Sequence, residues 1–468
     1  MTNDRTRRGI VGWLIRHPFL GASILAVLLL AAVAALLDRS ASNGIQRRIA
    51  EIRSRGEPAS AADLLAECSP LPDEENLTTA LIEAAKPLAT LEIPQDKAAV
   101  LPYFGSMYER PTLKTLTADQ LDAANWFLDR YADILRDVHG ACRLPTGWHG
   151  VRWTEPITHT PFGELVHLRH AWKLISLEVL AAAAANDQSR AGECLKKLFR
   201  CGHAFDKNRA VPDIALIHRR GIAEAAVTQT VDVINHCGLP PACLVALQTE
   251  LEHCRHPATL VGSIMVARVT YMDLWIHGRK TPVSLFDFQR MTPARRFKGE
   301  QAGLDAYTAL IAALQRPEDE VFSAFKSWQS STVIPSDCPS LGISVALSSD
   351  LITREFRLLA RSRALQTAIA CERFRLSQGR WPSELSELVP DYMNAIPNDL
   401  FDGQPLRYQM IPEGIKVWSI GPDGRDDGGD IDQQRPAAGT EAIEPKDVGW
   451  LIMHPELRAA YLSDDGEQ

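Results

Sequence analysis

The run from residue 18 to residue 37 constrains the chain most, because twenty consecutive residues there carry no charge. A helix of about 20 apolar residues spans the hydrocarbon core of a bilayer. Four arginines lie within residues 1–17, so the positive-inside rule predicts a cytoplasmic N-terminus and places the rest of the chain outside the membrane. We therefore expect a transmembrane helix over residues 18–37 in a single-pass protein of the cell membrane.

A cleaved secretory signal is the alternative interpretation of the same run. Residues Ala32-Val33-Ala34 have the small side chains that signal cleavage requires, and cleavage would give a secreted protein. The run is longer than the usual apolar region of a signal peptide, so its length favours an anchor. Basic residues such as Arg39 also follow the run and weaken the charge asymmetry on which the topology depends.

Composition limits the class of protein and of partner. With 468 residues, of which 46% are hydrophobic, the chain is long enough for two or three domains with packed cores. The net charge is −8 and basic residues are mixed with acidic ones, so nucleic acid is not expected as a partner, because phosphate binding needs a concentrated basic face. The nine cysteines include no CxxC pair and do not identify a redox compartment.

The fold expected after the apolar run is mainly α. Residues 40–115 alternate short helical segments with proline-containing joints and predict a stalk or lid. Residues 116–330 form the predicted α-helical domain, which begins with a capping box of Thr117 and Gln120. Its amphipathic segments are joined by short turns, a pattern typical of antiparallel helical hairpins.

Residues 348–468 are expected to form a small α+β module. A long helix from about Ser349 ends at Gly379, since glycine readily adopts the left-handed conformation that terminates helices. Two strand-like segments follow, residues 406–410 and residues 415–420, and the turn residues between them predict a β-hairpin. The hairpin leads directly into an acidic loop.

The acidic loop, residues 419–432, contains five aspartates and four glycines. Carboxylate oxygens suit a hard cation such as Ca²⁺, which takes about six to eight oxygen ligands, and glycines permit the tight backbone that adds carbonyl ligands. A solvated acidic turn is the simpler interpretation of the same residues. The pattern nevertheless predicts a calcium-binding loop.

This module resembles the C-terminal domain of the major pseudopilin of bacterial type II secretion, over about residues 366–432 only. The resemblance rests on five segments: Gly379-Arg380-Trp381-Pro382, Leu385 to Val389, Pro397-Asn398-Asp399, Asp402 to Tyr408, and Trp418 to Gly424. It implies a pseudopilin-like fold of a long helix, a small helix and a β-hairpin that carries a calcium loop. Residues 9–14 have neither the phenylalanine nor the glutamate that follow a pseudopilin leader, so assembly into a pilus is not expected.

The resemblance also implies the metal ligands. By position, Asp423 matches the family's loop aspartate and Ser419 matches a backbone carbonyl donor. Asp427 is a further candidate among the aspartates that follow. The end of the ligand set has two alignments: one, which we favour, uses Asp430, and the other treats residues 433–446 as an insertion and uses Asp447.

These features together predict a membrane-anchored extracytoplasmic protein of structural or interaction type, with a protein partner and a role in secretion or envelope organisation. The alternative is an enzyme whose site lies in the helical domain around four residues that could bind a metal or transfer protons: His149, His159, Glu164 and His167. The chain has no GxSxG or HExxH motif and no phosphate-binding glycine loop, so we favour a non-enzymatic role.

Overall fold

The computed structural model describes residues 18–66, 71–105, 111–253, 257–277, 293–334, 339–431 and 447–458. Within these residues the fold is mainly helical with a small three-stranded antiparallel sheet, which confirms the mainly α part of the predicted fold class. The α-helices are α2 (Pro18–Ser54), α3 (Ala61–Ala66), α4 (Leu77–Ala85), α5 (Gln95–Val100), α6 (Ala118–Arg130), α7 (Ala132–Ala141), α8 (Leu165–Ala184), α9 (Gln188–Cys201), α10 (Asp213–His236), α11 (Pro241–His253), α12 (Pro257–His277), α13 (Pro293–Leu314), α14 (Val321–Ser331), α15 (Pro339–Gln378) and α16 (Pro455–Arg458). The 3₁₀ segments are η1 (Asp73–Glu75), η2 (Lys86–Thr90), η3 (Ile157–His159), η4 (Gly202–Phe205) and η6 (Leu385–Leu388). The strands are β1 (Arg407–Ile411), β2 (Gly414–Ser419) and β3 (Val448–Met453).

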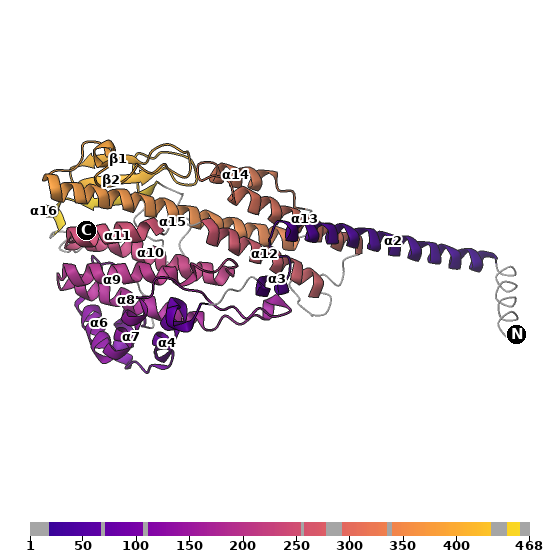
Figure 1. Cartoon of the computed structure of the whole chain (residues 1–468), viewed down its shortest axis with the longest axis horizontal. Coiled ribbons are helices and arrows are strands. Elements are labelled where there is room, and N and C mark those ends of the chain that lie inside the picture. The colour runs from indigo at the N-terminus through magenta and orange to yellow at the C-terminus, as the bar shows by residue number, and fades with distance from the viewer. Residues whose placement is uncertain are drawn as a thin grey trace.

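The helical hairpins stack side by side (Figure 1). α8 and α9 pack against each other and against α10, and α9 also contacts α11. α15 lies between α11 and the sheet, whereas α4, α6 and α7 cover the opposite side of α8. α8 is buried over most of its surface, because its leucines and alanines face neighbouring helices on both sides. One continuous hydrophobic core runs through the stack into the sheet.

The helix boundaries follow local hydrogen bonding. At the start of α6, Thr117 Oγ1 accepts from the Gln120 amide at 3.2 Å, and Gln120 Oε1 accepts from the Thr117 amide at 3.0 Å, so the predicted capping box is confirmed. Between α8 and α9, Asn186 adopts a positive φ of 57° and Asp187 caps α9 by accepting from the Arg190 amide at 3.0 Å. The cap at Asp187 permits a short connection between α8 and α9, as in antiparallel helical hairpins.

The segment interpreted from the sequence as a stalk or lid, residues 40–115, packs instead into the helical domain. Leu77 and Leu81 of α4 are fully buried in the main core. The Asn76 side chain accepts from the Thr78 amide and donates to the Trp148 carbonyl, which ties the start of α4 to a distant loop. Prolines interrupt the helices locally, but contacts with α7 and α8 decide that the segment is buried.

The helix that contains the apolar run, α2, continues well beyond residue 37. Its C-terminal half packs against α13, where Ile45 and Ile52 are buried and Arg48 Nε lies 2.7 Å from Asp305 Oδ1. Its N-terminal half extends away from the body of the molecule (Figure 1). Among the helices of the described residues, none is both long enough and apolar enough to cross a membrane.

The sheet has the order β1-β2-β3 and packs against α15. The predicted β1–β2 hairpin is present, with Arg407 opposite Trp418 and Ile411 opposite Gly414. β3 follows the acidic loop and pairs antiparallel with β2. The inward-facing side chains of β2 and β3 are fully or almost fully buried and join the main core: Ile415, Val417, Trp450 and Ile452.

α15 ends at the residue predicted from the sequence, but it begins earlier in the chain than predicted. Gly379 has a φ of +73° and its amide donates to the Arg375 carbonyl at 2.8 Å, which terminates the helix as expected from glycine. The helix begins at Pro339 and not near Ser349, because Leu341 is buried against the core and extends the packed face toward the N-terminus.

The outer edge of β3 is closed by a side chain of the helical domain. Asn235, near the end of α10, donates to the Leu451 carbonyl at 2.8 Å and accepts from the Met453 amide at 2.8 Å. Asn235 is itself buried, and α16 adds a second contact because Arg458 Nε donates to the Met453 carbonyl at 3.1 Å. The sheet is therefore fixed to the helical hairpins from both α10 and α15.

Candidate functional site

The acidic loop begins at a buried carboxylate network. Asp399 Oδ1 accepts from Ser419 Oγ at 2.8 Å, and its Oδ2 accepts from the Ile420 amide at 2.8 Å. Arg407 Nη1 lies 2.8 Å from the same Oδ2. Asp399 and Ser419 are both buried, so the network fixes the end of β2 and the direction in which the loop leaves the sheet.

Asp447 closes the loop from its other end. The side chain is 1% exposed, and its Oδ2 accepts from the Gly429 amide at 2.8 Å. Its Oδ1 is buried and has no hydrogen-bond partner among the described residues. Burial raises the pKa of this carboxyl, and the negative charges of Asp426 and Asp427 raise it further, against the opposing effect of backbone hydrogen bonds. A buried carboxylate oxygen in an electronegative setting is suited to a cation.

The segments that contain the two candidates for the last ligand, Asp430 and Asp447, lie next to each other in the structure. Ile431, the neighbour of Asp430, pairs with Asp447 in a parallel β-bridge. Asp430 is exposed, whereas Asp447 is buried and directly precedes β3. Of the two candidates, Asp447 therefore has the position and burial of a ligand at the entry to the next strand.

The remaining predicted ligands lie on the surface of the loop. Asp423 and Asp427 are exposed, and Asp423 Oδ1 accepts from the Arg425 amide at 3.2 Å in a local turn. Within the described chain, no three of the candidate calcium ligands Asp423, Asp427, Asp430 and Asp447 have carboxylate oxygens that all lie within 4.8 Å of one another. The loop supplies the donor types for Ca²⁺, and the orphaned Asp447 oxygen fits such an ion, but the donors are not gathered around one point.

Asp426 is a residue of the loop that the sequence reasoning did not select. Its Oδ1 accepts from Trp418 Nε1 at 3.0 Å and from the Gly428 amide at 3.1 Å. These hydrogen bonds, led by that of Trp418, lower the pKa of Asp426, and the positive charge of Arg407 contributes. The signal in the sequence was the tryptophan at the end of β2, whose indole needs an acceptor.

The four residues of the alternative enzyme hypothesis are not brought together as one site. His149 is buried, and burial lowers the pKa of its ring, with a smaller opposing effect from Glu164. His159 is exposed on the 3₁₀ segment η3. His167 lies beside His170 on α8, with ring centroids 6.4 Å apart. In the described part of the chain these residues do not form a metal-binding group.

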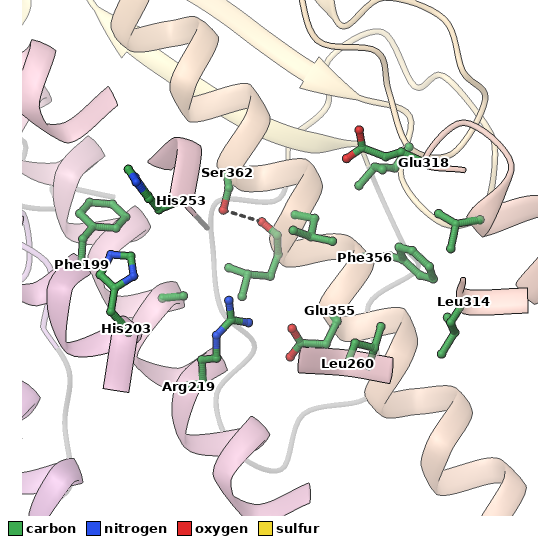
Figure 2. A pocket seen from close by; sticks show the side chains of 16 residues that line it. Phe199, His203, Arg219, His253, Leu260, Leu314, Glu318, Glu355, Phe356 and Ser362 are labelled. Carbon is green, nitrogen blue, oxygen red and sulfur yellow. Dashed lines mark hydrogen bonds between the residues drawn. The ribbon is translucent and has the colours of Figure 1, made fainter. Parts of the chain in front are cut away.

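A pocket opens elsewhere, where the hairpin stack meets α15 (Figure 2). Its volume is about 40 Å³, enough for a small polar group or a few water molecules. Most of its wall is apolar, including Phe199, Leu260 and Phe356, and Arg219 and Glu355 point toward the same space.

Glu355 places a buried carboxyl group in the wall of this pocket. The residue is 4% exposed, and its Oε1 has no hydrogen-bond partner among the described residues. Burial raises the pKa of Glu355 to about 7, although Arg219 and Arg220 act in the opposite direction. The Nε of Arg219 also lacks a partner in the described chain. The pocket thus presents one unused acceptor and one unused donor to a ligand.

His203 lines the same pocket but is already paired. Its Nδ1 lies 2.6 Å from Asp206 Oδ2 and its Nε2 lies 3.2 Å from Glu250 Oε2. The sequence around His203 contains no metal-ligand spacing. Asp206 is three residues away in the chain, whereas Glu250 comes from α11, so no local pattern could have indicated the second carboxylate.

Comparisons of the chain with protein-family models, with curated proteins and with solved structures give no match. The class of protein that the fold defines is a stack of α-helical hairpins with a docked three-stranded antiparallel sheet.

Proposed function

We propose that the protein is a membrane-anchored, extracytoplasmic protein of structural or interaction type, whose C-terminal pseudopilin-like module binds Ca²⁺ through its acidic loop. The observation that carries the proposal is the buried Asp447 oxygen, which lacks a partner among the described residues and lies beside further aspartates. A bound Ca²⁺ would neutralise these carboxylates and hold the loop against the end of β2. Secretion or envelope organisation is the process that the resemblance suggests.

The anchor is supported by the exposure of the projecting part of α2. Large apolar side chains there are exposed to between 50% and 64%: Val27, Leu28, Leu29 and Val33. Contiguous apolar surface of this kind is unfavourable in water and is typical of a segment that contacts a membrane or a partner. Together with the uncharged run of residues 18–37, this supports a single span with residues 1–17 in the cytoplasm.

The topology can be tested in intact cells. A reporter enzyme that folds only outside the cytoplasm, fused to the C-terminus, is expected to be active and to remain with the membrane fraction. Sequencing of the mature N-terminus distinguishes the anchor from a cleaved signal, because cleavage after Ala34 would remove the run. A soluble mature protein would overturn the anchor and leave the calcium proposal standing.

Calcium binding predicts a stability change that depends on Asp447. In the full chain, Ca²⁺ at about a hundredfold excess over its Kd should raise the free energy of unfolding of the module by about 3 kcal/mol relative to chelator. Asp447→Asn, which keeps the shape of the side chain and removes its charge, should abolish this difference. Thermal unfolding with Ca²⁺ and with chelator measures it.

Asp391→Asn is the matched control, since Asp391 is an exposed aspartate of the same module. It should respond to Ca²⁺ as the unmodified protein does. Identical unfolding with and without Ca²⁺ in the unmodified protein would contradict the proposal, as would a full calcium response in Asp447→Asn.

A ligand-binding or enzymatic role for the pocket of Figure 2 is the second candidate, and Glu355 is the observation that favours it. An acceptor on Glu355 and a donor on Arg219 match a small ligand with an amide group. In a thermal-shift screen of small amides, hits should stabilise the unmodified protein and the control Glu318→Ala, which alters a more exposed residue of the same wall. Equal stabilisation of Glu355→Ala, which has no side-chain acceptor, would remove this candidate.

A further inference from the structure

Three helices bring a histidine, a carboxylate and a thiol to one point in the hairpin stack. His139 lies near the end of α7, Glu178 in α8 and Cys194 in α9. The Nε2 of His139 is 2.7 Å from Oε2 of Glu178, and the ligand atoms of all three residues lie within 4.8 Å of one another. Nitrogen, oxygen and sulfur ligands of these types are those that Zn²⁺ takes in proteins.

The carboxylate of Glu178 is oriented so that one oxygen remains for a metal. Arg190 lies 3.0 Å from Oε1, which leaves Oε2, the oxygen nearest His139, as the ligand atom. Glu178 is 3% exposed and Cys194 is 1% exposed, so both anionic ligands would be shielded from water. Hydrogen bonds from an outer residue, here Arg190, commonly fix the orientation of metal ligands.

The cluster is accessible from solvent on one side. His139 lines an open cavity of about 360 Å³, formed mainly by residues of α7 and α9. Because His139 is also a member of the cluster, this cavity, which is lined largely by lysine and arginine side chains, connects the cluster to solvent and leaves room for a water molecule at a fourth coordination position.

We propose that His139, Glu178 and Cys194 bind a zinc ion, with water from the cavity as the fourth ligand. Three protein ligands with one open position are typical of zinc sites that activate water, whereas structural zinc sites use four protein ligands. On binding, the Cys194 thiol releases its proton to solvent and coordinates as the thiolate, and His139 coordinates as the neutral ring. The site is separate from the calcium loop, since a hard ion does not select sulfur and imidazole ligands.

Cobalt substitution in the full chain tests the site directly. Metal-free protein titrated with Co²⁺ should develop a thiolate-to-cobalt charge-transfer band and the intense visible bands of a tetrahedral ion, saturating at one equivalent. Added Zn²⁺ should displace the cobalt and remove the bands. Cys194→Ser should lack the charge-transfer band, and His139→Gln should weaken cobalt binding by at least about tenfold.

Cys201→Ser is the matched control, because Cys201 is equally buried on the same helix and its Sγ lies 3.9 Å from that of Cys142. It should retain the cobalt spectrum. Circular dichroism of each metal-free variant shows whether it is folded, and His139→Gln keeps the test decisive if Cys194→Ser does not fold. The absence of a charge-transfer band in the unmodified protein, or its loss in Cys201→Ser with retention in Cys194→Ser, would overturn the proposal.

Discussion

At the scale of single residues, His203 shows how neighbours set a charge. Burial alone would lower the pKa of its ring, but hydrogen bonds to Asp206 and Glu250 outweigh burial and raise the pKa to about 9. Arg200 shares Glu250 at 3.1 Å, so the carboxylate is held between two cations. At neutral pH the imidazole is therefore a buried cation that links η4 to α11.

This pair of contacts predicts a loss of stability above neutral pH. The folded-state pKa of His203 is raised from about 6.5 to about 9, so its stabilisation is fully present below about pH 6.5 and is lost as the pH rises through about 9. The shift corresponds to about 3 kcal/mol. Urea unfolding of the full chain across this window, compared with His203→Gln, measures the effect.

His159→Gln is the control, because His159 is exposed. Its stability should follow that of the unmodified protein at every pH. If His203→Gln loses as much stability as the unmodified protein across the same window, the pH dependence has another origin.

At the scale of elements, the crossing of α12 and α13 leaves room only for a glycine. A Cβ added at Gly303 would lie 1.9 Å from the ring of Tyr271. Tyr271 is 4% exposed and its hydroxyl donates to the Gly299 carbonyl at 3.1 Å, so the ring is held in place. Close approach of the two helices therefore depends on a missing side chain.

Gly303→Ala is expected to destabilise the protein by about 1–3 kcal/mol, because overpacking outweighs the better helix propensity of alanine. Gly221→Ala in α10 is the control, since no atom lies within 4 Å of the added Cβ, and it should stabilise by up to about 1 kcal/mol. Chemical denaturation measures both. Stabilisation by both substitutions would show that α12 and α13 are not in close contact.

The elements also show what the sequence predicts and what it cannot. The end of α15 at Gly379 and the β1–β2 hairpin depend on local turn chemistry, and both predictions are confirmed. The burial of residues 77–85 depends on contacts with distant helices, which the prolines in the surrounding sequence could not indicate.

For the site residues too, local sequence features could be predicted and long-range contacts could not. The aspartates of the acidic loop could be recognised because they are close together in the sequence, whereas the burial of Asp399 and Asp447 arises only in the folded sheet and loop. The group of His139, Glu178 and Cys194 was missed because each residue comes from a different helix and their spacing has no motif.

At the scale of the whole molecule, the contacts between the sheet and the helical hairpins predict that both unfold as one cooperative unit. Asn235→Ala would leave the Leu451 carbonyl and the Met453 amide without their partner, at an expected cost of about 1–3 kcal/mol. Hydrogen exchange at the Met453 amide should become faster in this variant. Thermal unfolding of the unmodified protein should show a single transition, and separate melting of the residues after α15 would contradict the prediction.

The closed edge of β3 also restricts how other chains can join this sheet. Strand addition, the route by which extended peptides and aggregating proteins attach to a β-sheet, needs free amides and carbonyls along an outer strand. Asn235 and Arg458 occupy such groups on β3, so any intermolecular ladder would have to grow from β1. Because strands can be added only beside β1, this sheet can form the end of an intermolecular β-sheet but cannot continue it on both sides.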